Sequence, residues 1–147
     1  MATTLLIGYG NPLRSDDGIG PAVAEVFAAK FGSEEGIVTI ACHQLLPEHA
    51  EPISKAERVI FVDAEAGPDP GSITVRELEP DAASSAGLIH DFSPQTLLAY
   101  AQTLYGQAPP AVMVTVGGYS FAHGDSLSKE MAALLPTIVE CITARLG

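Results

Sequence analysis

The sequence is short of basic residues, and this shortage excludes two kinds of partner. Only 7 of its 147 residues are lysine or arginine, against 18 aspartates and glutamates, so the formal net charge is -11. A protein that binds nucleic acid needs a basic face to displace counterions from the phosphates, and no such face is expected here. The same acidity disfavours an anionic membrane surface. We therefore expect neither nucleic acid nor a membrane as partner.

Cysteine and long apolar runs are also scarce. The two cysteines, Cys42 and Cys141, lie far apart and form no C-x-x-C pair, so we expect buried free thiols rather than disulfides or a zinc knuckle. No apolar run reaches the ~20 residues that a membrane-spanning helix needs. The start of the chain, residues 1–4, lacks the positive charge with which a signal peptide begins. These features predict a cytoplasmic protein.

Short apolar runs alternate with amphipathic segments along the chain. We expect strands at 3–8, 37–42, 58–63, 72–78 and 111–116, and helices at 21–31, 47–54, 93–104 and 126–145. The connection between the third and fourth strands is too short for a parallel crossover, which favours an antiparallel pairing. The pattern predicts a single α/β domain over residues 1–147. It is a three-layer α/β/α sandwich, whose mostly parallel twisted sheet has about five strands, one of them antiparallel.

Three potential metal ligands lie where such a sheet places its sites, at the carboxyl ends of strands. Asp17 follows the first strand, Asp63 ends the third, and His90 precedes the helix that begins near Ser93. Two carboxylates and an imidazole suit a borderline divalent metal with positions left open for a substrate. The alternative is that all three are solvated loop residues.

The loop after the first strand, GYGNPLRSDDGIG at 8–20, argues against a nucleotide site. A dinucleotide-binding loop needs glycine where this chain has Leu13, and Asp16 and Asp17 would repel a pyrophosphate. The glycines instead allow a tight loop with positive φ angles, which Asn11 can fix through hydrogen bonds to its own backbone. Asp16 fits two roles, the N-cap of the following helix or a group of the site.

Three polar residues near other strand ends have two interpretations each. His43 and Gln44 follow the second strand, and His123 lies in the loop after the last strand, at the same expected edge. Each is either a substrate contact or an ordinary loop residue. His49 is expected on an exposed helix face. No G-x-S-x-G elbow occurs, so a serine hydrolase is not expected.

One motif is specific enough to suggest a family. The pattern Gly8-x-Gly10-Asn11-x-Leu13-x-x-Asp16-Asp17-Gly18-x-Gly20 resembles the N-terminal signature of the [NiFe]-hydrogenase maturation proteases, the endopeptidases that process the hydrogenase large subunit. The resemblance continues through the segment at 42–48, the strand that ends in Asp63, and His90 before its helix, and so covers nearly the whole chain. The family often has glutamate where this chain has Asp17, whose carboxylate reaches one methylene less far.

The resemblance implies an endopeptidase that removes the C-terminal extension of a [NiFe]-hydrogenase large-subunit precursor after nickel insertion. It implies that Asp17, Asp63 and His90 contact the nickel already in the substrate, with no permanently bound cofactor. Asp16 is then a candidate to activate water or to orient Asp17. We expect substrate contacts from Gly10, Asn11, His43, Gln44 and His123. The alternative function is a non-catalytic chaperone that binds nickel or the precursor with the same acidic cleft.

Overall fold

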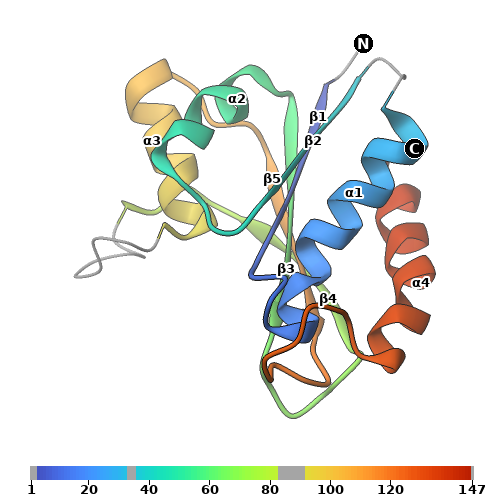
Figure 1. The fold of residues 1–147 in the computed structure, drawn as a ribbon. Coiled ribbons are helices and arrows are strands. Elements are labelled where there is room, and N and C mark those ends of the chain that lie inside the picture. The colour runs from blue at the N-terminus through green and yellow to red at the C-terminus, as the bar shows by residue number, and fades with distance from the viewer. Residues whose placement is uncertain (1–2, 33–35, 83–91, 147) are drawn as a thin grey trace.

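The computed structural model describes residues 3–32, 36–82 and 92–146. Its strands form one sheet in the order β2-β1-β3-β5-β4 (Figure 1). Their bounds are β1 Thr4–Tyr9, β2 Ile37–Cys42, β3 Arg58–Glu65, β4 Ile73–Leu78 and β5 Ala111–Gly117. The pairs β1·β2, β1·β3 and β3·β5 are parallel, and β4 is antiparallel to β5. The predicted mostly parallel sheet with one antiparallel strand is confirmed.

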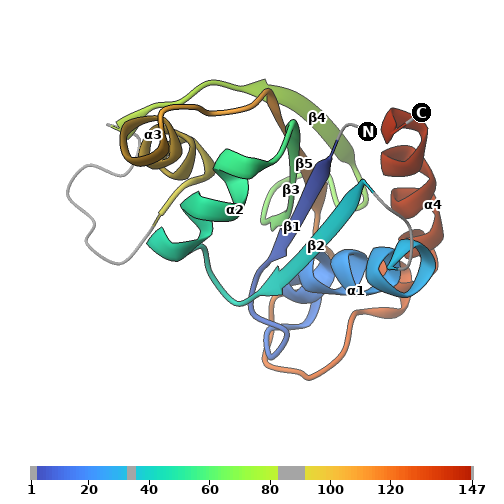
Figure 2. The ribbon, with the colours of Figure 1, turned by 90° about the horizontal axis from the view of Figure 1, so that it is seen from above.

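Helices cover both faces of the sheet, which gives the three predicted layers. On one face lie α1 Ile19–Phe31 and α4 Lys129–Leu146, and on the other lie α2 Ala50–Lys55 and α3 Pro94–Tyr105 (Figures 1 and 2). Two short 3-10 helices, η1 Ser15–Gly18 and η2 Pro47–His49, precede α1 and α2. Among the described residues, no helix has both the length and the hydropathy needed to cross a bilayer.

The apolar side chains form one cluster on each face of the sheet. Along β1, Leu5 and Ile7 belong to the cluster under α2 and α3, whereas Leu6 belongs to the one under α1 and α4. All three are at most 1% exposed. Because the central strands are buried on both faces, they appear in the sequence as continuous apolar runs rather than as an alternating pattern.

The sheet differs from the prediction in one neighbour and in several boundaries. The antiparallel strand β4 pairs with β5, which lies between β3 and β4, and not with the strand that precedes it in sequence. Strand β3 continues to Glu65, so Asp63 lies two residues before its end. Helix α1 begins at Ile19, two residues early, and α4 begins at Lys129, three residues late. Ser93 caps α3 as expected, accepting a hydrogen bond from the Thr96 N–H.

Two expectations about burial are wrong. His49 is buried rather than exposed, and its Nδ1 accepts a hydrogen bond of 2.9 Å from the Leu46 N–H. The imidazole therefore serves a local purpose, because it satisfies a backbone donor at the start of η2 that would otherwise lack a partner. Cys42 and Cys141 are free thiols, as expected, but both are only partly buried.

Candidate functional site

The carboxyl ends of the parallel strands meet at one edge of the sheet, at the bottom of Figure 1. The loops at 10–18, 66–72 and 118–128 run along this edge. Asp17 lies in the first of these loops, and Asp63 lies near the end of β3. The fold therefore places both predicted acids at the edge where open α/β sheets bind their ligands.

The loop at 10–18 is held by contacts that also fix Asp17. Gly10 has a φ of 146°, and a Cβ there would lie 2.0 Å from the Asp17 carbonyl oxygen, so no other residue fits without a shift. The Asn11 N–H donates to Asp17 Oδ2 at 2.7 Å, while Asn11 Oδ1 accepts from the Leu13 N–H at 2.9 Å. The predicted tight loop is confirmed, and both Gly10 and Asn11 contribute to the position of the Asp17 carboxylate.

Asp16 is fully buried, and both of its carboxylate oxygens accept hydrogen bonds. Oδ2 accepts from the Tyr119 N–H (2.8 Å), the Ser120 N–H (3.1 Å) and the Ser128 hydroxyl (2.8 Å), and Oδ1 accepts from the Ser128 N–H (2.8 Å). The N-cap interpretation is wrong, because the N-cap of α1 is Gly18 and no side chain caps that helix. Asp16 instead joins the loop at 10–18 to the loop at 118–128.

Further hydrogen bonds between the same two loops surround His123. The Ser15 hydroxyl donates to the Ala122 carbonyl at 2.8 Å, the Ser15 N–H donates to the Gly124 carbonyl at 3.1 Å, and the Gly124 N–H donates to the Leu13 carbonyl at 3.0 Å. Ser15 adopts the left-handed conformation, with a φ of 52°, to make these contacts. His123 is exposed and lies on the joined loops, at the edge of the sheet where the sequence predicts it.

Asp63 has a partly buried carboxyl group with an unusual proton affinity. Burial raises the pKa of Asp63 to about 7, with a further rise from the nearby negative charge of Asp17. Hydrogen bonds from the Ala64 N–H, at 2.8 Å, and from the Tyr9 hydroxyl oppose this rise. Burial also raises the pKa of Tyr9, so its hydroxyl keeps its proton and donates to Asp63. Near pH 7 the Asp63 carboxyl is therefore close to half protonated, which suits a group that exchanges protons.

The structure brings together two of the three predicted metal contacts. The charge of Asp17 acts on Asp63 across the edge of the sheet, whereas His90 lies outside the described residues. Within the described ranges, no group of three or more histidines, cysteines and acids could hold a metal ion. Asp17 and Asp63 thus lie close enough for their charges to interact, without a third ligating group beside them in the described ranges.

The remaining predicted contacts lie at the same edge without joining this pair. His43 and Gln44 are exposed and follow β2 directly. In the part of the chain that the structure describes, no hydrogen bond links either of them, or His123, to Asp17 or Asp63. They are accessible to a substrate at the site, but they do not position its acids.

Sequence reasoning missed Tyr9 and Ser128. Tyr9 contacts Asp63, and its only signal is its place at the end of the first strand, between two glycines of the motif. Ser128 donates twice to Asp16, and the sequence holds no local sign of this contact because the two residues are 112 positions apart.

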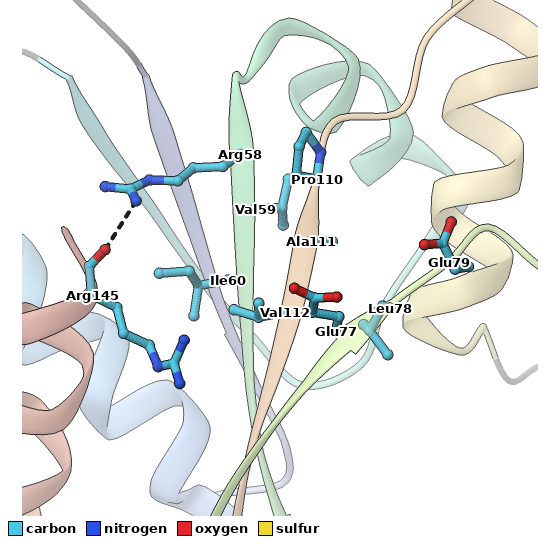
Figure 3. Close-up of a pocket in the computed structure, with 10 residues that line it drawn as sticks. All are labelled: Arg58, Val59, Ile60, Glu77, Leu78, Glu79, Pro110, Ala111, Val112 and Arg145. Atoms are coloured by element: carbon cyan, nitrogen blue, oxygen red, sulfur yellow. Dashed lines mark hydrogen bonds between the residues drawn. The ribbon is translucent and has the colours of Figure 1, made fainter.

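A pocket of about 270 Å³ lies at the opposite edge of the sheet, away from these acids. Figure 3 shows Arg58, Glu77 and Arg145 in its lining. The Arg58 guanidinium donates to the carbonyls of Arg145 and Leu146, both at 2.9 Å, and so satisfies the last turn of α4. This arginine therefore stabilises a helix end, and the amino ends of parallel strands are not where such sheets place their active sites.

Comparison with solved structures finds the same fold in hydrogenase maturation endopeptidases. The hydrogenase 2 maturation peptidase of Thaumarchaeota archaeon SCGC_AB-539-E09 is 20% identical with a TM-score of 0.72, over 99% of this chain and 98% of that one. The hydrogenase maturating endopeptidase HybD of E. coli is 20% identical with a TM-score of 0.74, over 98% and 91%. The [NiFe] hydrogenase maturation protease HycI of Thermococcus kodakarensis KOD1 is 21% identical with a TM-score of 0.76, over 96% and 90%.

No protein-family model matches the chain, and no curated protein matches it significantly. The structural similarity nevertheless covers nearly the full length of both chains in each comparison. The motif at 8–20 predicted the fold of the hydrogenase maturation endopeptidases, and the comparisons confirm that this chain has that fold.

Proposed function

We propose that this protein is an endopeptidase that removes the C-terminal extension of a [NiFe]-hydrogenase large-subunit precursor. The observation that carries the proposal is the pair of acids, Asp17 and Asp63, at the carboxyl edge of a sheet with this fold. The motif that resembles the family signature is also the loop whose backbone fixes Asp17. The cytoplasmic location expected from the sequence stays a prediction.

Asp17 and Asp63, with His90 as the third group, are proposed to contact the nickel already inserted in the substrate. In the free protein, burial raises the pKa of the Asp63 carboxyl, and the negative charge of Asp17 raises it further. A divalent cation between them would favour the ionised form of both. The charge of the site then depends on whether the substrate carries its metal, which would make cleavage conditional on nickel insertion. No cofactor of the protein's own is needed for this recognition.

Peptide hydrolysis requires a polarised carbonyl group, an activated water molecule and a protonated leaving amine. The substrate's nickel would polarise the carbonyl, and the Asp63 carboxyl, with a pKa of about 7, is suited to exchange a proton at neutral pH. Asp16 has both oxygens engaged with the loop at 118–128, which favours its role as a positioning residue for Asp17 over a direct role in activating water.

The test is the intact mass of the host's own large-subunit precursor after incubation with this protein, with and without nickel in the precursor. We expect loss of a C-terminal peptide from the nickel-loaded sample alone. Asp63→Asn should abolish the cleavage. Glu77→Gln, which neutralises an exposed acid of β4 at the opposite edge of the sheet, should leave it intact. Stable binding of the loaded precursor without cleavage would instead identify the chaperone alternative.

A further inference from the structure

A row of side chains capable of hydrogen bonding crosses the sheet beside Asp63, on the face covered by α2 and α3. We call it the polar row. In the order of the strands it consists of Cys42, Tyr9, Asp63, Thr115 and Thr74. One residue comes from each of the five strands.

The pairing register of the sheet builds this row. Tyr9 lies opposite Cys42, and Thr115 lies opposite Asp63 on one side and Thr74 on the other. Strands β1 and β3 are joined through the hydrogen bond between Tyr9 and Asp63. Side chains of paired residues point to the same face of a sheet, so the row is continuous across all five strands.

The polarity of this row is confined to the edge of the sheet. Two residues earlier on each of the three inner strands, the same face carries Ile7, Phe61 and Met113, which all belong to the buried core. Thr115 is partly buried and Thr74 is exposed, so both side chains keep solvent-accessible surface beside Asp63.

An arginine completes this surface. Arg76 follows Thr74 by two residues on β4, on the same face, and lies opposite Met113. It is exposed, and its charge acts on the Tyr9 hydroxyl. Among the described residues, no carboxylate lies within salt-bridge distance of it. In a chain with a net charge of -11, a guanidinium without an ion pair among the described residues is well suited to bind an anionic group of a substrate.

We propose that the polar row and Arg76 form a subsite for the peptide substrate, in which the threonine hydroxyls bind the peptide main chain and Arg76 pairs with a substrate carboxylate. The proposal rests on the proposed function, since it assumes that the scissile bond lies at Asp17 and Asp63. Arg76 is two strands away from Asp63, roughly 10 Å at about 4.8 Å per strand, and two residues further along its strand, roughly 7 Å, so the two backbones are about 12 Å apart. An extended peptide covers roughly this distance in three to four residues, so the carboxylate belongs about three to four residues from the scissile bond.

The test uses a synthetic peptide that spans the processing site of the host's large-subunit precursor, with binding measured by fluorescence anisotropy. Arg76→Gln should weaken binding about tenfold, whereas Arg145→Gln, a matched change of an exposed arginine at the opposite edge, should not. Replacing the peptide carboxylate by an amide should weaken binding to the unmodified protein by the same factor. The same amide peptide should bind Arg76→Gln no more weakly than the carboxylate peptide does, because the two changes remove the same contact.

Cleavage of the nickel-loaded precursor gives the second readout. For Arg76→Gln we expect KM to rise about tenfold while kcat stays nearly constant, because the contact lies away from the reacting atoms. Arg76→Lys keeps the charge but loses the planar fork, and should recover only part of the affinity. If binding of the peptide depends on its carboxylate but the precursor is not cleaved, the subsite is supported and the proposed function is wrong. Cleavage with an unchanged KM in Arg76→Gln, and equal peptide binding, would overturn the subsite alone.

Discussion

The burial of Asp16 makes this carboxylate a point at which the protein should be highly sensitive to a single substitution. Asp16 accepts hydrogen bonds from three backbone N–H groups and one hydroxyl of the loop at 118–128, and it has no exposed surface. Asp16→Ala would leave all four donors without their acceptor. A hydrogen bond to a charged group is worth about 1.5–3 kcal/mol, although water will reach some of the donors once the loop loosens.

We therefore expect Asp16→Ala to lower the free energy of unfolding by about 3–5 kcal/mol, a range typical of breaking a buried charged network. This is a large part of the roughly 5–15 kcal/mol that stabilises a domain. Asp16→Asn keeps an acceptor at the Oδ2 position but places an N–H₂ group against the Ser128 N–H, so it should lose about 2–3 kcal/mol. The measurement is urea unfolding followed by circular dichroism.

Asp17→Asn is the matched control, because Asp17 is the adjacent acid and, within the described part of the chain, its carboxylate accepts one backbone hydrogen bond, from the Asn11 N–H. It should lose only about 1 kcal/mol. Hydrogen exchange supplies a local readout, since the amides of Tyr119, Ser120 and Ser128 should lose protection in Asp16→Asn and keep it in Asp17→Asn. The free energy of unfolding of Asp16→Ala could instead lie within about 1 kcal/mol of that of the unmodified protein, which is the contribution of one neutral hydrogen bond. The carboxylate would then not hold these loops together.

Three further substitutions test the site and its scaffold. The pKa of Asp63 is about 7 in the folded protein, above its ordinary 3.8. The folded state therefore holds this proton more tightly than the unfolded state, and the free energy of unfolding should fall by roughly 2–4 kcal/mol as the pH rises from about 4 to about 7. Asp63→Asn should remove that fall in urea titrations at several pH values, and parallel pH profiles of the two proteins would contradict the raised pKa. Val62→Ala should lose about 2–3 kcal/mol by opening a cavity while kcat stays unchanged, and a loss of kcat alone would place Val62 in the site instead. Asp17→Glu should keep substantial cleavage of the precursor by mass spectrometry, and complete inactivity would show that the loop admits only the shorter acid.

The strands could be predicted well because their apolar runs are a local property of a sheet that is buried on both faces. The order of the strands could not be predicted, because β5 lies between β3 and β4, and this position depends on contacts between residues far apart in the sequence. The placement of Asp17 and Asp63 at one edge of the sheet was predictable, because Asp17 follows β1 and Asp63 lies near the end of β3. The partners of Asp16 were not, because they lie more than 100 positions away. His49 was misjudged because its ring satisfies a backbone donor three residues earlier.

The adjacent acids Asp16 and Asp17 have opposite environments, and the short helix that carries them explains why. Both lie in η1, a 3-10 helix, in which successive side chains point about 120° apart. When one carboxylate points inward to the loop at 118–128, its neighbour must point elsewhere, and here it points to the edge where Asp63 lies. A pair of acids in this motif thus separates two tasks that one residue cannot perform. The first, with both oxygens hydrogen-bonded, fixes the loop, and the second keeps acceptor capacity for a further partner, because within the described residues it accepts one hydrogen bond, from Asn11.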